Sequence, residues 1–185
     1  MGTTITTTVT RTTIIITATG IITTAIKRNL GDEAHLEAAV ASMLQLNKRA
    51  AELAQTVAVH SVTDITGYGL LGHGSELARN SGVGLRISAH ALPALPGALQ
   101  YAGNGVVPGG LNRNHEYVER DGYVRYLGEI DAAHTALLFD PQTSGGLLIA
   151  LPPADADALQ ARYAEARQAC WRIGEVIGGD GIEIV

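Results

Sequence analysis

The order of strand-like and helix-like segments constrains the fold of this chain more than any other feature. Short apolar runs rich in β-branched residues interrupt longer stretches in which apolar residues recur at spacings of three and four, as at Leu36, Val40, Met43 and Leu44. The two kinds of segment follow one another without the strict alternation of a βαβ protein. The sequence therefore predicts an α/β (α+β) fold, a mixed β-sheet covered by helices.

Turn residues and periodicity give the expected bounds of these segments. The expected strands are Thr56–Val62, Val83–Ser88, Tyr123–Leu127, Leu137–Asp140, Leu147–Leu151, Trp171–Ile177 and Ile182–Val185. The expected helices are Ile21–Asn29, Glu33–Gln55 with a division at Asn47, Leu70–Arg79 and Pro153–Ala169. The stretch Ala91–Arg120 is rich in proline and glycine and is expected to hold short helices and loops rather than a second domain.

Composition limits the partners and the compartment of the chain. Its 185 residues, 46% of them apolar, suffice for one domain with a sizeable core. The net charge of −5, without a basic cluster, argues against a nucleic-acid partner. The single cysteine, Cys170, excludes an internal disulfide, and no apolar stretch approaches the ~20 residues that cross a bilayer. With no signal-peptide pattern at its start, the chain is expected in the cytoplasm, without a membrane partner.

The first nineteen residues differ from the rest. Met1–Thr19 consists mostly of threonine and isoleucine, whose β-branched side chains favour an extended backbone. A single strand of this kind needs a partner sheet to cover its faces. We expect residues 1–19 to be a remnant strand or a stretch of uncertain identity, and residues 20–185 to form the domain.

The first candidate site is the stretch Val62–His73. An apolar strand is expected to end at Asp64, and Gly67 and Gly69 then form a turn that opens a helix. Glycine allows close backbone approach, the start of a helix attracts phosphate, and a carboxylate at the strand end can hold Mg²⁺ against that phosphate. The alternative is that Asp64 caps the helix and the glycines only make a tight turn.

Two further glycine-rich stretches are weaker candidates. Asp140–Gly146 is expected to join two strands, and its hydroxyls and backbone amides could line a ligand pocket. A structural turn held by Asp140 explains that pattern equally well. Gly105–Asn114 could form a loop that brings Arg113 near an anion.

Other catalytic chemistries find little support in the sequence. The six histidines include no pair at metal-ligand spacing, and with one cysteine no structural zinc site is expected. No Ser-His-Asp arrangement or nucleophile elbow is recognisable. His73 is expected to pack on its helix or lie at the surface, and Cys170 is expected to be buried, without a neighbour that stabilises a thiolate.

Five stretches in a fixed order resemble the C-terminal domain of the selenophosphate synthetase (selenide, water dikinase) family, within the AIR-synthase-like superfamily. The resemblance runs from about Gly20 to the end of the chain, and the order of the stretches is more specific than any one of them. They are Gly20–Arg28, Thr63–His73, Leu92–Ala98, Val107–Gly110 together with Asn114, and Phe139–Leu147.

The resemblance implies an enzyme that converts ATP, selenide and water to selenophosphate, AMP and phosphate. It also implies a homodimer whose subunits hold the nucleotide and Mg²⁺ between two domains. Asp64 matches the aspartate that the C-terminal domain contributes to metal binding. Gly67 and Gly69 belong to the same motif and would shape its phosphate-facing turn. The Asp140–Gly146 loop matches a family signature, without a role for each residue.

The chain also departs from the family pattern. The N-terminal domain of the family, with its nucleophilic cysteine or selenocysteine, its lysine and the other metal-binding aspartates, has no counterpart here. A Lys-Pro-Leu-Gly-Thr-Gly-like stretch of the family reads Ile16–Gly20 in this chain, without lysine or proline. We therefore expect no catalytic residue in this chain and no activity from it alone, because phosphoryl transfer needs several groups at once.

Two alternatives remain open. The chain could be a non-catalytic module that binds nucleotide or pairs with a separately encoded half. It could instead belong to another ATP-using enzyme of the superfamily, such as AIR synthase, thiamine-monophosphate kinase or the hydrogenase-maturation dehydratase. The Pro-Gln-Thr-Ser-Gly-Gly loop beside the Pro-Gly-Gly…Asn motif favours the selenium enzyme over these relatives.

Overall fold

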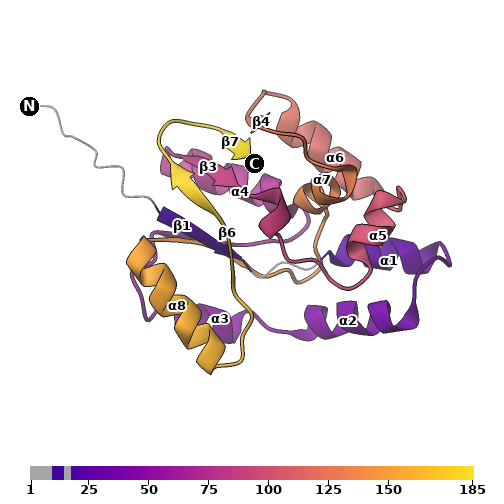
Figure 1. Ribbon diagram of the computed structural model, residues 1–185, viewed down its shortest axis with the longest axis horizontal. Helices are drawn as coiled ribbons and strands as arrows, with labels where there is room; N and C mark the ends of the chain where they lie inside the picture. The colour runs from indigo at the N-terminus through magenta and orange to yellow at the C-terminus, as the bar shows by residue number, and fades with distance from the viewer. Residues whose placement is uncertain (1–9, 15–17) are drawn as a thin grey trace, which may run out of the picture.

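A computed structural model of the chain describes the backbone of residues 10–14 and the whole of residues 18–185 (Figure 1). The strands are β1 (Thr10–Ile14), β2 (Ser61–Asp64), β3 (Gly84–Ile87), β4 (Val124–Tyr126), β5 (Leu147–Leu151), β6 (Trp171–Ile177) and β7 (Ile182–Ile184). The helices are α1 (Thr19–Lys27), α2 (Glu33–Leu44), α3 (Lys48–Ala54), α4 (Gly69–Ser81), α5 (Ala98–Gly103), α6 (Gly109–Glu119), α7 (Ala132–Phe139) and α8 (Pro153–Glu165), with a 3-10 turn η1 (Ala89–Ala91).

The seven strands of the described residues form one sheet in the order β2-β5-β1-β6-β3-β7-β4. The pairs of β7 with β3 and with β4 are parallel, and the other pairs are antiparallel. The prediction of a mixed sheet covered by helices is therefore confirmed. Asp64, the last residue of β2, lies on an edge strand of this sheet.

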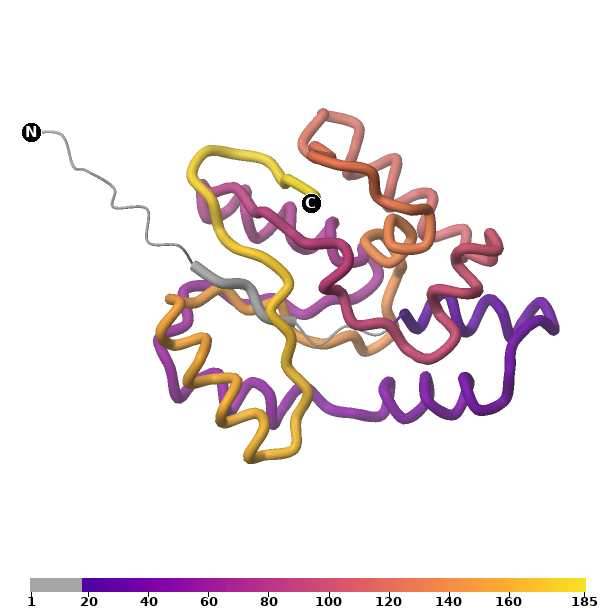
Figure 2. The backbone as a smooth tube through the Cα atoms, viewed as in Figure 1, coloured from indigo at the N-terminus to yellow at the C-terminus, as the bar shows by residue number. Residues whose placement is uncertain are grey.

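Helices cover both faces of the sheet, and β5 shows how the core divides. All five residues of β5 are buried. Because side chains alternate between the faces of a strand, Leu147, Ile149 and Leu151 pack against α3 and α8, whereas Leu148 belongs to the larger core beneath α1, α4, α5, α6 and α7. Figure 2 shows α3 and α8, which are distant in sequence, lying side by side at one end of the molecule.

The strand predicted at Leu137–Asp140 is wrong. Residues Ala132–Phe139 form helix α7 instead, and Asp131 caps it by accepting hydrogen bonds from the backbone N–H groups of Ala133 and His134. A short apolar run can be a buried strand or a buried helix segment, and here the cap and the packing favour the helix. The Asp140–Gly146 loop therefore joins a helix to a strand, not two strands.

The other predicted elements are mostly confirmed, with shifts at their ends. The long stretch Glu33–Gln55 is divided into α2 and α3 around Asn47, as predicted. The strand predicted at Thr56–Val62 begins only at Ser61 and ends at Asp64, because residues 55–60 form a turn and irregular backbone after α3. The bounds of β5 and β6 match the prediction to the residue.

The threonine- and isoleucine-rich start of the chain is described only in part. The backbone of Thr10–Ile14 is extended, as its β-branched composition predicts, and β1 pairs with both β5 and β6. Residues 1–9 and 15–17 lie outside the described part, so the division at residues 19 and 20 stays a prediction. Within the described residues, no helix is both long and apolar enough to pass through a lipid bilayer.

Candidate functional site

Asp64 ends the edge strand β2 directly opposite Leu147 of β5. The residue is exposed, and in residues 18–185 its carboxylate has no hydrogen-bond or ion-pair partner. Helix α4 starts after Tyr68 and has no side-chain cap, so the alternative that Asp64 caps this helix is wrong. A carboxylate in this position is open to a ligand that approaches the edge of the sheet.

The turn after Asp64 packs against the end of α7. Gly69 has a φ of +70°, and a Cβ at this position would lie 2.9 Å from the carbonyl carbon and oxygen of Phe139. Only glycine fits both requirements without strain. The Nδ2 group of the buried Asn114 donates to the carbonyl oxygens of Gly67 (2.9 Å) and Phe139 (3.0 Å) and so ties the turn to α7.

The two predicted glycines therefore lie in different environments. Gly67 is exposed, with open space where a Cβ would be, whereas Gly69 is buried. Thr66 lies between Asp64 and Gly67, and its hydroxyl contacts His73 Nε2 at 3.1 Å. The exposed part of the turn, next to Asp64, is thus Gly67 and Tyr68, while Gly69 fixes its shape.

The Asp140–Gly146 loop supports the same turn. Ile65 donates its backbone N–H to the carbonyl oxygen of Gly146, and Gln142 donates its own to the carbonyl oxygen of Thr66. A Cβ on Gly145 would overlap the backbone oxygen of Ile65, so the two segments approach as closely as glycine allows. The structure therefore brings these two predicted stretches into direct contact.

Asp140 is fully buried and faces the start of α1. Its Oδ2 accepts hydrogen bonds from the backbone N–H of Gly20 (3.0 Å) and from Gln142 Nε2 (2.8 Å). Burial raises the pKa of the Asp140 carboxyl to about 7, although the backbone N–H groups of Ile21 and Gly20 and the Gln142 amide counteract this rise. The geometry therefore favours a structural role for Asp140, which holds the loop against the start of α1.

Gln142 and Thr143 complete the cap of α1. The Oε1 of Gln142 accepts hydrogen bonds from both the backbone N–H and the hydroxyl of Thr19, each at 3.1 Å. The hydroxyl of Thr19 in turn accepts from the backbone N–H of Thr143. Because α1 has no cap of its own at Ala18, a loop more than 120 residues away satisfies its first N–H groups.

Thr143 and Ser144 are the exposed residues of this loop. Ser144 has a φ of +51°, which side chains other than glycine, asparagine and aspartate rarely adopt. The carbonyl oxygen of the next residue, Gly145, accepts a hydrogen bond from Asn47 Nδ2. The loop therefore exposes two hydroxyl side chains, and hydrogen bonds of Thr143 and Gly145 hold its backbone in place.

The third predicted stretch is partly helical rather than a loop. Gly109–Asn114 forms the first half of α6, and Arg113 is exposed. The residue of this stretch that reaches the candidate site is Asn114, through its contact with Gly67. Its position in a family-like motif was the only signal in the sequence that could have pointed to it.

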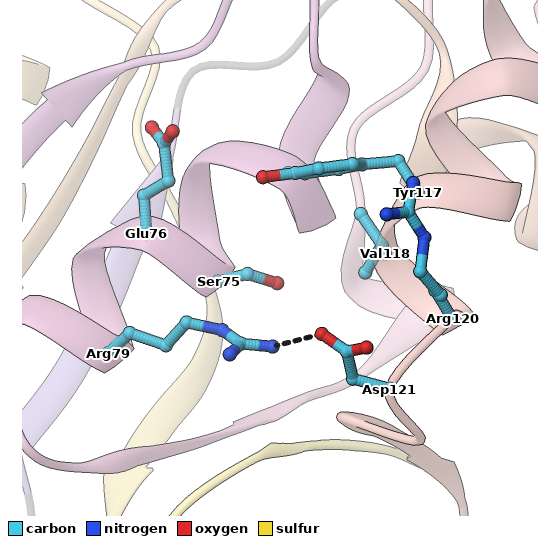
Figure 3. A pocket seen from close by; sticks show the side chains of 8 residues that line it. Ser75, Glu76, Arg79, Tyr117, Val118, Arg120 and Asp121 are labelled. Carbon is cyan, nitrogen blue, oxygen red and sulfur yellow. Dashed lines mark ion pairs between the residues drawn. The ribbon is translucent and has the colours of Figure 1, made fainter.

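A separate cavity of about 140 Å³ lies between α4 and α6 (Figure 3). Arg79 and Asp121 form an ion pair across it at 3.8 Å. It contains neither Asp64 nor any residue of the Asp140–Gly146 loop, and its lining carries charges of both signs. The lining residues are Gly72, Ser75, Glu76, Arg79, Tyr117, Val118, Arg120 and Asp121.

The sequence profile described as "AIR synthase related protein, C-terminal domain" matches residues 13–185. The chain belongs to this family. Curated relatives named selenide, water dikinase include those of Pelobacter propionicus (41% identical over 160 residues) and Yersinia pestis (43% over 171 residues). These matches cover 86% and 90% of this chain but 45% and 47% of the relatives. The chain therefore spans about half the length of the curated relatives it matches, and the resemblance stated from the motifs is confirmed.

Several solved structures share the fold of this chain. Thiamine-monophosphate kinase from Stenotrophomonas maltophilia superposes with a TM-score of 0.64 at 16% identity, covering 95% of this chain and 49% of the kinase. Escherichia coli HypE gives a TM-score of 0.62 at 20% identity, covering 98% of this chain and 47% of HypE. A HypE structure in complex with ATP gives a TM-score of 0.54 at 18% identity, covering 91% of this chain and 42% of HypE.

Proposed function

We propose that this domain is the C-terminal part of an ATP-dependent selenophosphate synthetase, which converts ATP, selenide and water to selenophosphate, AMP and phosphate. The observation that carries the proposal is the 43% identity over 171 residues to a curated selenide, water dikinase. The related proteins of known structure support the use of ATP, since one of them is a complex with that nucleotide. Because these structures are at most 20% identical to this chain, they do not indicate which phosphate acceptor it uses.

Asp64 is proposed to contribute one carboxylate ligand to the Mg²⁺ that accompanies the nucleotide. Its exposure and the lack of a partner for it among residues 18–185 fit this role, because Mg²⁺ prefers oxygen ligands and usually takes one or two carboxylates together with phosphate oxygens. The ion would neutralise negative charge on the phosphates. The remaining ligands would come from outside the described residues.

The other residues of the site hold this carboxylate and the neighbouring backbone in place. Asn114 fixes the carbonyl group of Gly67, and Gln142 fixes that of Thr66, so the turn after Asp64 cannot rotate freely. Phosphoryl transfer depends mainly on the positions of charged groups rather than on covalent chemistry by the protein. A rigid turn beside Asp64 would limit the conformational entropy that is lost when the nucleotide binds.

The rest of the active site is proposed to lie in a second domain. That domain would supply the cysteine or selenocysteine nucleophile, the lysine and further aspartates, and it would close over the edge of the sheet that carries Asp64. Two such subunits would form a homodimer in the cytoplasm. The matches to about half of each curated relative support a two-domain enzyme.

The test is a chimera in which this chain replaces the matching part of the Escherichia coli selenide, water dikinase, to which it is 39% identical. We expect the purified chimera to form AMP from ATP only when selenide is present, with selenophosphate detected by phosphorus NMR. A folded chimera that binds ATP but makes no selenophosphate would contradict the proposal. The unaltered enzyme of Escherichia coli serves as the positive control.

A further inference from the structure

A histidine of η1 meets two side chains from the start of α7, which lies about forty residues further along the chain. His90 lies on η1, and Asp131 and His134 lie at the start of α7. One ligand atom from each of the three lies within 4.8 Å of the others. From this juxtaposition we propose that His90, Asp131 and His134 hold a divalent transition-metal ion of the zinc class.

His90 is held in place by its neighbours in the chain. The backbone N–H of Ser88 donates to the carbonyl oxygen of Ile173 (2.8 Å), and that of Ala89 donates to the carbonyl oxygen of Val185 (2.9 Å). Ala89 and Leu92 are buried on either side of the exposed His90. The backbone of η1 is therefore fixed, and only the imidazole ring has to rotate to meet an ion.

The carboxylate of Asp131 is oriented by the helix that it caps. Its Oδ1 accepts the backbone N–H groups of Ala133 and His134, both at 3.0 Å, which leaves Oδ2 directed at the ring of His134. His134 Nδ1 lies 2.6 Å from Oδ2. An ion that displaces the proton shared by this pair would have both Oδ2 and Nδ1 as ligands, because metal ligands bind in their deprotonated form.

The two imidazole rings already lie close together. Their centroids are 4.3 Å apart, at an interplanar angle of 65°. Around a tetrahedral zinc ion, with bonds of about 2.0–2.1 Å, ligand atoms are separated by about 3.4 Å. The three ligand atoms lie within 4.8 Å of one another, so each separation needs to change by at most ~1.5 Å, which small rotations of these side chains can supply.

The donor set selects the class of ion. Imidazole nitrogens suit zinc, cobalt, nickel and copper, whereas magnesium and calcium prefer oxygen ligands alone. Three protein ligands at the surface leave at least one position for water. The bound ion would link η1, at the end of β3, to the start of α7 and would stabilise the folded chain by mass action.

Metal binding is measured with the untagged chain after treatment with a chelator. Co²⁺ is followed by its visible absorption and Zn²⁺ by titration calorimetry. We expect one equivalent of each metal to bind, with a dissociation constant below about 100 μM. His90→Gln and His134→Ala should each weaken binding at least tenfold, and His60→Ala, at an exposed histidine outside the cluster, should leave it unchanged.

The variant Asp131→Asn distinguishes a loss of metal binding from a loss of the helix cap. Asparagine caps helices about as well as aspartate, so this variant should fold and yet bind Zn²⁺ at least tenfold more weakly, because it lacks the carboxylate ligand. Zn²⁺ should raise the melting temperature of the wild-type chain and of His60→Ala but not that of His90→Gln. The proposal is overturned if no binding is seen up to about 1 mM metal, or if the cluster variants bind like the wild-type chain.

Discussion

Asp64 and Asp140 are both aspartates beside glycine-rich turns, but their surroundings are opposite. Asp64 is exposed and has no partner in residues 18–185, whereas Asp140 has no exposed surface and receives hydrogen bonds from Gly20 and Gln142. Sequence patterns make either residue a candidate ligand. The structure separates them, because the Asp140 carboxyl is enclosed at the start of α1 and bonded to it through Oδ2, whereas the Asp64 carboxylate is open to a ligand.

The position of Asp64 at the end of a strand can be predicted from the sequence, whereas the hydrogen-bond partners of Asp140 cannot. The end of a strand before a glycine turn is a local pattern, and Asp64 lies where that pattern predicts. The contact of Asp140 with Gly20 joins residues 120 positions apart. No local spacing encodes such a contact, and it exists only because α1 packs against the loop that follows α7.

The raised pKa of Asp140 makes stability depend on pH. The folded chain holds this proton up to about pH 7, whereas the unfolded chain releases it near pH 4. The contribution of the protonated carboxyl is therefore complete below about pH 4 and is lost as pH rises to about 7. Asp140→Asn keeps the side chain neutral and removes this dependence.

The free energy of unfolding of the wild-type chain should therefore fall relative to Asp140→Asn by on the order of 3 kcal/mol between pH 4 and pH 7.5. Urea unfolding of both proteins across this range measures the difference. Taking the difference between the two proteins cancels the titration of all other groups. A difference that stays constant with pH would show that Asp140 titrates in the ordinary range.

At the scale of the elements, the turn between β2 and α4 depends on one glycine much more than on the other. Gly69 has a positive φ and lies against the carbonyl group of Phe139, whereas Gly67 has open space around its Cα. Gly69→Ala should therefore destabilise the chain by about 2 kcal/mol or more. Gly67→Ala, the matched control, should change stability by less than about 1 kcal/mol.

Thermal and urea unfolding of the two variants measure this contrast. Equal losses from both substitutions would contradict the packing described for Gly69. Far-UV circular dichroism of both variants checks that the helix content is retained, so that a loss of stability is not confused with a different fold.

The elements differ in how well the sequence encodes them. β5 and β6 are predicted to the residue, because turn residues bound their apolar runs closely. α7 was predicted in part as a strand, since its apolar run Leu137–Phe139 is too short to show a helical period. Asp131 at its N-cap was the available signal. His90 and His134 likewise meet only through the packing of η1 on α7.

At the scale of the whole molecule, the domain packs two hydrophobic cores on either side of one sheet, and within the described residues no further strand pairs with the outer edge of β2. The candidate site lies at this edge and contains a single exposed carboxylate, Asp64. One carboxylate and a turn cannot neutralise a triphosphate. We therefore expect the chain by itself to bind nucleotide weakly and to catalyse nothing.

Titration calorimetry of the chain alone with Mg-ATP should give a dissociation constant weaker than about 1 mM, which corresponds to about −4 kcal/mol. A coupled assay should detect no selenide-dependent AMP. Micromolar binding, or any selenide-dependent turnover by the purified chain, would show that the site needs no second domain.

The most direct test of the central claim is the effect of Asp64→Asn on the chimera with the Escherichia coli enzyme. The matched control is Asp180→Asn, at another exposed aspartate. If Asp64 holds Mg²⁺ at the nucleotide, selenide-dependent AMP formation should fall at least ~100-fold in Asp64→Asn and stay unchanged in Asp180→Asn. Equal activity of the two variants at limiting and at saturating Mg²⁺ would contradict the claim.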